Sequence, residues 1–225
     1  MMTSRGRWLG MVVLVGAVAC SRGSTSEAPV PSTRAAAAEG SEAAGADATG
    51  LVEKLKFKDD EDREVLSLKP KPDGAKLIDG EGREVARYKW KGADLEVSGP
   101  DDAVLARVSR EGDGFVVRDA RSGPVRFSLV RDGAGWRLLD GAGVPRYSVV
   151  ADGPGFRVSE PSGEERLRVH VREGKVSLRE PSGRTRFATK SPVRPVAVAC
   201  LGFESLDLPL RGALLFLLQD PASSR

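Results

Sequence analysis

The sequence predicts a mainly β fold, an antiparallel meander of about seven hairpin repeats that closes into a barrel around a hydrophobic C-terminal helix. Three observations lead to this prediction. From residue 51 onward, turn residues recur about every 20 positions. Between the turns lie short runs in which apolar and polar side chains alternate, the pattern of half-buried strands. Near the end of the chain, residues 205–220 would be apolar on almost every side of a helix.

The first segment has the features of a signal peptide. Arg5 and Arg7 precede an apolar run, Trp8–Val18, that is followed by small residues. This run is too short to span a membrane, which takes roughly 20 apolar residues, and it suits the apolar region of a secretory signal. We therefore expect residues 1–19 to be removed from the mature protein.

The end of this segment is similar to the lipobox of bacterial lipoproteins. The motif is Ala17-Val18-Ala19-Cys20, with Ala17 where Leu is usual. The resemblance implies an acylated Cys20, and several acyl chains anchor stably because each buried CH₂ contributes about 0.8 kcal/mol. It also implies the outer membrane, since Ser21 replaces the Asp that marks inner-membrane retention. An ordinary secretory signal is the alternative, because Ala17-Val18-Ala19 also suits the common signal peptidase.

Residues 20–50 are rich in Ser, Ala, Gly, Glu and Pro and have almost no large apolar residue. Such a segment cannot bury enough surface to fold, so it is predicted to be a disordered tether. The formal net charge of the whole chain is +3, and removal of the signal peptide takes two arginines with it. The mature chain is then nearly neutral, which argues against a nucleic-acid partner.

Each repeat in residues 51–220 contains two turns and two short strands, which gives fourteen or fifteen strands in all. One set of turns is predicted at Asp62, Gly82, Asp101, Gly123, Gly143, Gly163 and Gly183. The second set is predicted at Gly74, Gly92, Gly112, Gly133, Gly153 and Gly174. A single hairpin cannot bury its apolar face, so neighbouring hairpins must stack or the sheet must close.

Aromatic and basic residues recur at fixed places in the repeats. The aromatic residues Phe115, Trp136, Phe156, Phe127, Tyr147 and Phe187 are predicted to anchor the core. The arginines Arg126, Arg146, Arg166 and Arg186 are predicted to form a row on the outer face, because adjacent strand residues point to opposite faces. This row serves either to protect edges and keep the protein soluble or to bind a ligand.

Lys54, Lys56 and Lys58 share the strand face opposite Leu55 and Phe57. A basic stripe of this kind is a candidate contact for anionic lipid headgroups, with a solvated surface as the alternative.

The pattern changes near the C-terminus. Residues 196–203 are predicted to form a last strand, residues 207–219 a helix, and residues 221–225 a short tail. Asp207 suits the N-cap and Pro209 the first turn of this helix. The helix is too short to cross a bilayer, so it needs an apolar cavity in protein. An open single-layer meander is the alternative fold, and it would leave the helix without such a cavity.

These features resemble the superfamily of tubby C-terminal domains, phospholipid scramblases and plant LURP-one-related proteins. The strand pairs FVVRDARSGPVRFSLV and WRLLDGAGVPRYSVV and the ending PLRGALLFLLQD carry the resemblance, which covers about residues 51–220. It implies a closed barrel of twelve strands around a hydrophobic helix, with lipid handling as one activity. No phosphoinositide-binding or calcium-binding residue carries over to this sequence.

Catalytic motifs are missing from the sequence. His170 is the one histidine and is predicted to be an exposed strand residue, while Cys200 is predicted to be a buried structural thiol. A zinc site needs more such ligands, and no cofactor fingerprint occurs. The acidic residues Asp79, Asp119, Asp140, Glu160 and Glu180 recur at the spacing of the repeats. They serve to accept hydrogen bonds at turns, to bind calcium or, in a hydrolase, to act as catalytic carboxylates. We therefore expect a non-catalytic binding or structural module of the cell envelope, on its periplasmic or outer face, without metal or cofactor and with a protein or lipid partner.

Overall fold

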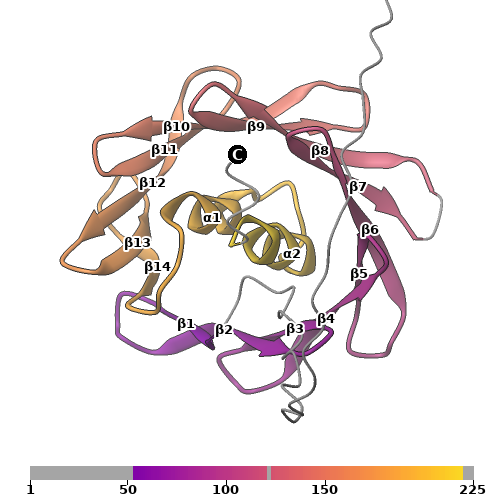
Figure 1. Ribbon diagram of the computed structural model, residues 1–225. Helices are drawn as coiled ribbons and strands as arrows, with labels where there is room; N and C mark the ends of the chain where they lie inside the picture. Colours follow the sequence, from indigo (N-terminus) through magenta and orange to yellow (C-terminus); the bar gives the residue numbers. More distant parts are fainter. Residues whose placement is uncertain (1–52, 121–122, 220–225) are drawn as a thin grey trace, which may run out of the picture. The chain divides into compact units, whose positions relative to one another are not determined.

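The computed structural model describes residues 53–120 and 123–219, which form a closed barrel with helices inside it (Figure 1). The predicted signal peptide, Cys20, the tether and the tail 221–225 lie outside the described residues. Within these residues fourteen strands lie in sequence order, each antiparallel to its neighbours, and β1 pairs with β14 to close the ring. The predicted closed meander is confirmed, and the open sheet is wrong. The strand number differs from the twelve that the superfamily resemblance implied.

The first seven strands are β1 (Leu55–Lys58), β2 (Glu64–Lys71), β3 (Gly74–Asp79), β4 (Glu84–Lys91), β5 (Asp94–Ser98), β6 (Val104–Glu111) and β7 (Gly114–Asp119). The next seven are β8 (Val125–Asp132), β9 (Gly135–Asp140), β10 (Pro145–Asp152), β11 (Gly155–Ser159), β12 (Glu165–Arg172), β13 (Lys175–Arg179) and β14 (Thr185–Thr189). The helical segments are α1 (Pro195–Ala199), the 3-10 helix η1 (Cys200–Gly202) and α2 (Leu208–Leu218).

Two kinds of turn alternate along the chain. At one end of the barrel, hairpins such as β10–β11 close with a two-residue loop, and Gly153 there has a φ of 57°, the left-handed value that a type II′ turn requires at its first loop position. At the other end the turns are longer. In the turn between β9 and β10, Asp140 Oδ1 accepts the backbone N–H groups of Ala142 and Val144 at 3.0 and 2.9 Å. These side-chain hydrogen bonds hold the longer turns in shape.

A β-bulge recurs beside each of the longer turns. In all seven hairpins the register shifts, so that two residues of the later strand face one residue of the earlier strand. The additional residues are Val65, Val85, Leu105, Arg126, Arg146, Arg166 and Arg186. The predicted row of four arginines thus occupies bulge positions, and a bulge changes the direction in which a side chain points.

The helices fill the inside of the barrel. α1 packs against β11, β12 and β13, while α2 packs against β3, β4 and β5 (Figure 1). Leu214 and Leu215 are completely buried, and the ring of Phe216 stacks on that of Tyr88 with 6.2 Å between centroids. The predicted C-terminal helix is confirmed. The predicted aromatic anchors are buried or packed against the core.

The strand predicted for residues 196–203 is wrong, because the chain forms α1 and η1 there. A short apolar run does not by itself distinguish a buried strand from a buried helix. Pro195 suits the first turn of a helix, and the three successive residues Ala197, Val198 and Ala199 are all buried. A segment enclosed by the barrel has no solvent-facing side. Its sequence therefore needs no alternation of apolar and polar residues, and the pattern cannot distinguish a helix from a strand.

Candidate functional site

A row of cations crosses the outer wall of the barrel near the junction of β1 and β14. Arg172 at the end of β12 faces Lys175 at the start of β13. The registers of β13 with β14 and of β14 with β1, continued by one or two residues, place Lys190, the residue after β14, and Lys56 of β1 at the same level. We call these four cations the basic row: Arg172, Lys175, Lys190 and Lys56.

The basic row lines two adjoining depressions with volumes of ≈ 630 and ≈ 260 Å³, which share Lys175 and Lys190. Two small buried residues, Ser177 and Ala188, lie beside Lys175 and Lys190 on the same face, between His170 and Lys58. We call the two depressions together the basic groove; besides the basic row, its charged and titratable lining residues are Lys58, Asp62, His170, Glu173 and Arg179. Cations outnumber carboxylates in this lining.

Part of this positive charge lacks a partner. Lys58 Nζ donates to Asp62 Oδ2 at 2.7 Å. Lys175 and Lys190, in contrast, have no carboxylate oxygen within 4.0 Å among residues 53–120 and 123–219. The hydrogen bond from Lys58 lowers the pKa of Asp62, and the proximity of Lys175 and Lys190 lowers it further. One carboxylate is therefore close to three lysines.

His170 lies at the other side of the basic groove and is exposed, as predicted. Partial burial lowers its pKa, and the nearby Arg179 and Arg168 guanidinium groups lower it further. The imidazole is consequently neutral at pH 7, and the positive charge of the groove comes from its lysines and arginines.

The three lysines predicted to contact lipid lie on the outer face, and the two residues between them are buried. Lys54 and Lys56 both approach Glu64, at 2.9 and 3.4 Å, so the stripe along β1 is largely paired with carboxylates. The stronger basic site arises where Lys175 of β13 and Lys190, directly after β14, come close to β1 from a distant part of the sequence. Sequence reasoning missed those two residues because their closeness to β1 depends on closure of the barrel.

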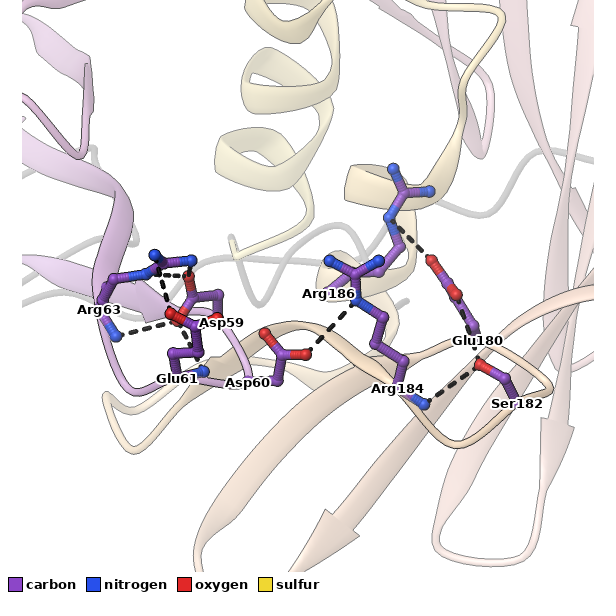
Figure 2. A network of polar contacts seen from close by, with 8 residues as sticks. All are labelled: Asp59, Asp60, Glu61, Arg63, Glu180, Ser182, Arg184 and Arg186. Carbon is purple, nitrogen blue, oxygen red and sulfur yellow. Dashed lines mark hydrogen bonds and ion pairs between the residues drawn. The ribbon is translucent and has the colours of Figure 1, made fainter.

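The junction of β1 and β14 has the shortest ladder in the barrel. It has a single register pair, whereas every other junction among the described strands has at least four. Ser191 Oγ extends it by accepting the N–H of Lys56 at 3.2 Å. At the end with the longer turns, Arg184 lies 3.4 Å from Asp60 across the junction (Figure 2). Side-chain contacts thus add to the few backbone hydrogen bonds that join β1 to β14.

The repeated carboxylates are used within the turns. Asp79 Oδ1 accepts the N–H groups of Glu81 and Arg83 at 3.0 and 2.9 Å, and Asp140 does the same in its turn. Figure 2 shows the corresponding turn between β13 and β14, where the hydroxyl of Ser182 accepts the N–H of Arg184 instead. The other three carboxylates pair with bulge arginines: Asp119 with Arg126, Glu160 with Arg166 and Glu180 with Arg186.

Two of the bulge arginines also hold the helices inside the barrel in place; we call α1, η1 and α2 together the helical plug. Arg186 pairs with Glu204, in the loop between η1 and α2, and Arg166 lies 4.0 Å from the same carboxylate. Arg211 of α2 donates from Nε to the carbonyl of Leu206 at 2.7 Å, which ties this loop to the helix. These contacts, at the end of the barrel with the longer turns, therefore have a structural role.

The remaining predicted residue lies in the core. Cys200 is buried in η1 as a free cysteine, and its burial raises the pKa of the thiol. Within residues 53–120 and 123–219, no three His, Cys, Asp or Glu side chains are grouped so as to hold a metal ion. No helix of this part of the chain is both long enough and apolar enough to span a membrane.

Comparison of the chain with protein families, curated proteins and solved structures found no match. The basic groove is therefore the feature from which a function can be inferred.

Proposed function

We propose that this protein is an outer-membrane lipoprotein, anchored through an acylated Cys20, whose barrel is a non-catalytic binding module. The basic groove is the observation that carries the binding role. The interior is filled by α1, η1 and α2, so a ligand has to meet the barrel on its outer surface. The repeated carboxylates are engaged in turns and ion pairs, which supports binding over hydrolysis.

The proposed anchor and the groove lie close together along the chain. Lys56 belongs to β1, the first strand, and about 35 residues separate it from Cys20. A flexible tether of that length has a typical reach of about 30 Å. An acylated Cys20 would therefore hold the groove close to the membrane surface, where a ligand of the envelope is concentrated.

The test of anchoring is fractionation of cells that produce the full chain or its Cys20→Ser variant. We expect the wild-type protein in the outer-membrane fraction, extractable with detergent, and the variant in the soluble fraction. A variant that stays with the membranes would show that acylation of Cys20 is not the anchor. A wild-type protein found entirely in the soluble fraction would overturn the proposal as well.

Lipid handling is the second candidate, and the basic groove is what favours it. Flotation of the full-length Cys20→Ser protein with liposomes of phosphatidylcholine, alone or mixed with phosphatidylglycerol, tests it at several salt concentrations. Salt-sensitive flotation with the anionic lipid would make lipid the ligand of the barrel. Absence of flotation would leave Cys20 as the membrane contact and direct attention to ligands of another kind.

A further inference from the structure

We infer that the basic groove binds a linear anionic glycan, a polysaccharide with acidic groups on successive sugars, which lies across β12, β13, β14 and β1. The inference rests on the proposed role of the barrel as a binding module and adds the class of ligand. Four cations in a row, one each from β12, β13 and β1 and one directly after β14, match a chain that carries regularly spaced negative charges.

The basic row works against the stability of the barrel. Like charges directly opposite each other on neighbouring strands are destabilising, and here Arg172 faces Lys175, which is level with Lys190. Cations also face each other elsewhere on the wall, as Lys76 faces Lys69 and Arg87, but there a carboxylate lies close: Lys76 pairs with Glu84 at 2.6 Å.

Arg172 and Lys56, at the two ends of the row, lie 3.2 and 3.4 Å from Glu173 and Glu64. The two central lysines, in contrast, have no carboxylate oxygen within 4.0 Å among residues 53–120 and 123–219. This unpaired centre, in a surface otherwise rich in ion pairs, indicates that an anion from outside the chain completes it.

The direction of the row favours a flexible chain over a flat surface. Neighbouring strands lie about 4.8 Å apart, so three strand spacings place the four cations over a distance of about 14 Å. These three spacings also make up about a fifth of the circumference, since fourteen strands close the barrel. A flat bilayer touches a convex wall along a narrow line and cannot reach all four cations closely, whereas a polymer follows the curve.

The lining of the groove argues for a glycan among the polymers. Among the described residues no Phe, Tyr or Trp lines the groove, and the imidazole of His170 is its one aromatic ring, whereas single-stranded nucleic acids are usually held by stacking of successive bases on several aromatic residues. Protein partners are usually anchored by large apolar or aromatic residues in pockets, and Val171 is the largest apolar residue that lines the groove. Shallow walls of Lys, Arg and Ser suit hydroxyl and acidic groups instead.

The experiment measures binding of the full-length Cys20→Ser protein to polygalacturonate, a linear glycan with one carboxylate per sugar, by calorimetry at low and at physiological salt. The test variant carries Lys175→Glu and Lys190→Glu. The matched control carries Lys71→Glu and Lys91→Glu, which make the same change of charge at exposed lysines of β2 and β4. We expect the wild-type protein and the control to bind, and the Kd of the test variant to be at least about tenfold higher, or about 1.4 kcal/mol.

Thermal unfolding accompanies the binding assay. The test variant should melt at the same temperature as the wild-type protein or higher, because each Glu relieves repulsion in the basic row. A lower melting temperature of the test variant would contradict the claim that repulsion within the basic row destabilises the barrel. No binding of polygalacturonate by the folded wild-type protein, or equal weakening in test and control variants, would overturn the inference.

Two further ligands are tested in the same binding assay: vesicles of phosphatidylglycerol, and the acidic polypeptide poly-glutamate. Binding to either one that depends on Lys175 and Lys190, without binding to polygalacturonate, would overturn the glycan and leave the binding module intact. The membrane fractionation of the Cys20→Ser variant is independent of all these arms. Failure of the anchor and failure of the glycan inference are therefore distinguishable.

Discussion

Cys200 shows at the scale of one residue how enclosure by the barrel controls chemistry. Its side chain lies in η1, and the whole residue is 1% exposed. Burial raises the pKa of the thiol because the apolar surroundings disfavour the thiolate, the form that reacts with electrophiles. The same residue in an exposed loop would be a reactive thiol.

We predict that Cys200 in the full-length Cys20→Ser protein reacts with Ellman's reagent at least 100-fold more slowly than the same thiol in denaturant. The slow rate follows from burial, since reaction requires local or global opening. Rapid labelling in the native protein would contradict the enclosed position of η1. A free-cysteine peptide provides the reference rate.

The turn aspartates couple the fold to pH. The Arg83 side chain lowers the pKa of Asp79, and the N–H of Val144 lowers that of Asp140; further hydrogen bonds act in the same direction in each turn. A carboxyl with a lower pKa in the folded state than the ordinary value of about 3.9 adds stability above that value. This contribution is lost as the pH falls through the folded pKa.

We therefore predict that the melting temperature falls as the pH is lowered from 5 to 2. Asp140→Asn keeps an oxygen that can accept the turn hydrogen bonds but removes the charge, so this variant should lose less stability over the same range. Asp113→Asn, in a two-residue turn, is the matched control and should follow the wild-type curve. Identical slopes for Asp140→Asn and the wild-type protein would contradict a role of the Asp140 charge.

Residues within one strand could be assigned from the sequence, whereas residues brought together by closure could not. Alternation placed Lys56 and Lys58 of β1, and Lys54 directly before it, on the outer face correctly, because the side-chain period of a strand is two. Lys175 and Lys190 lie more than 100 residues further along the chain. Their position beside β1 depends on which strand closes the ring, and no local pattern contains that information.

At the scale of elements, the fit between α2 and the wall is tightest at Gly212. A Cβ built there would lie 2.2 Å from the hydroxyl of Tyr88 and 2.9 Å from a methyl group of Leu77. The Tyr88 hydroxyl itself donates to the carbonyl of Pro209 at 2.8 Å. Glycine thus allows the helix to approach the barrel closely enough for this hydrogen bond to form.

We predict that Gly212→Ala lowers the free energy of unfolding by about 1–2 kcal/mol. Overpacking costs about 1–3 kcal/mol, and it outweighs the gain of about 1 kcal/mol in helix propensity from Ala. Tyr88→Phe alone should cost about 1 kcal/mol through the lost hydrogen bond. The double variant should be clearly more stable than the sum of both losses implies, because Phe lacks the oxygen that clashes; additive losses in a denaturant titration would contradict this contact.

The helical elements also show where sequence patterns become ambiguous. The α2 segment was predicted because its leucines recur over three turns and Pro209 suits its start. The five-residue α1 is shorter than two turns and consists of Val, Ala and Pro, which fit a buried strand equally well. Its location inside the barrel decides the outcome, and this location is a tertiary feature.

At the scale of the whole molecule, the repeats predicted the hairpins and their number, since turns spaced by about 20 residues define two strands each. Closure followed from one further requirement, a cavity for the apolar α2. The arrangement of the bulges was not predicted, because two residues facing one across a ladder leave the alternation of each strand almost unchanged.

The short ladder between β1 and β14 makes this junction the place where the barrel is expected to open first. We predict that the β1 amides exchange with solvent faster than those of β6 or β8 in native-state hydrogen exchange. Ser191→Ala should accelerate exchange at Lys56 about fivefold or more, since it removes the acceptor of that N–H. Ser109→Ala, in β6, is the control; uniform exchange through global unfolding alone would contradict the prediction.

The plug gives the barrel a means of fixing its own strand number. Hairpins of such similar length and pattern offer no local reason to stop at seven, and duplication of one unit in the gene would extend the wall smoothly. The circumference grows with every added pair of strands, however, so α1 and α2 would no longer fill the interior. The cavity left would lower the free energy of unfolding by about 24 cal/mol per Å³. Loss of a unit would crowd the same helices. Lineages that gain or lose a hairpin should therefore show a matching change in the volume of the C-terminal helices, so that wall and plug evolve as a pair.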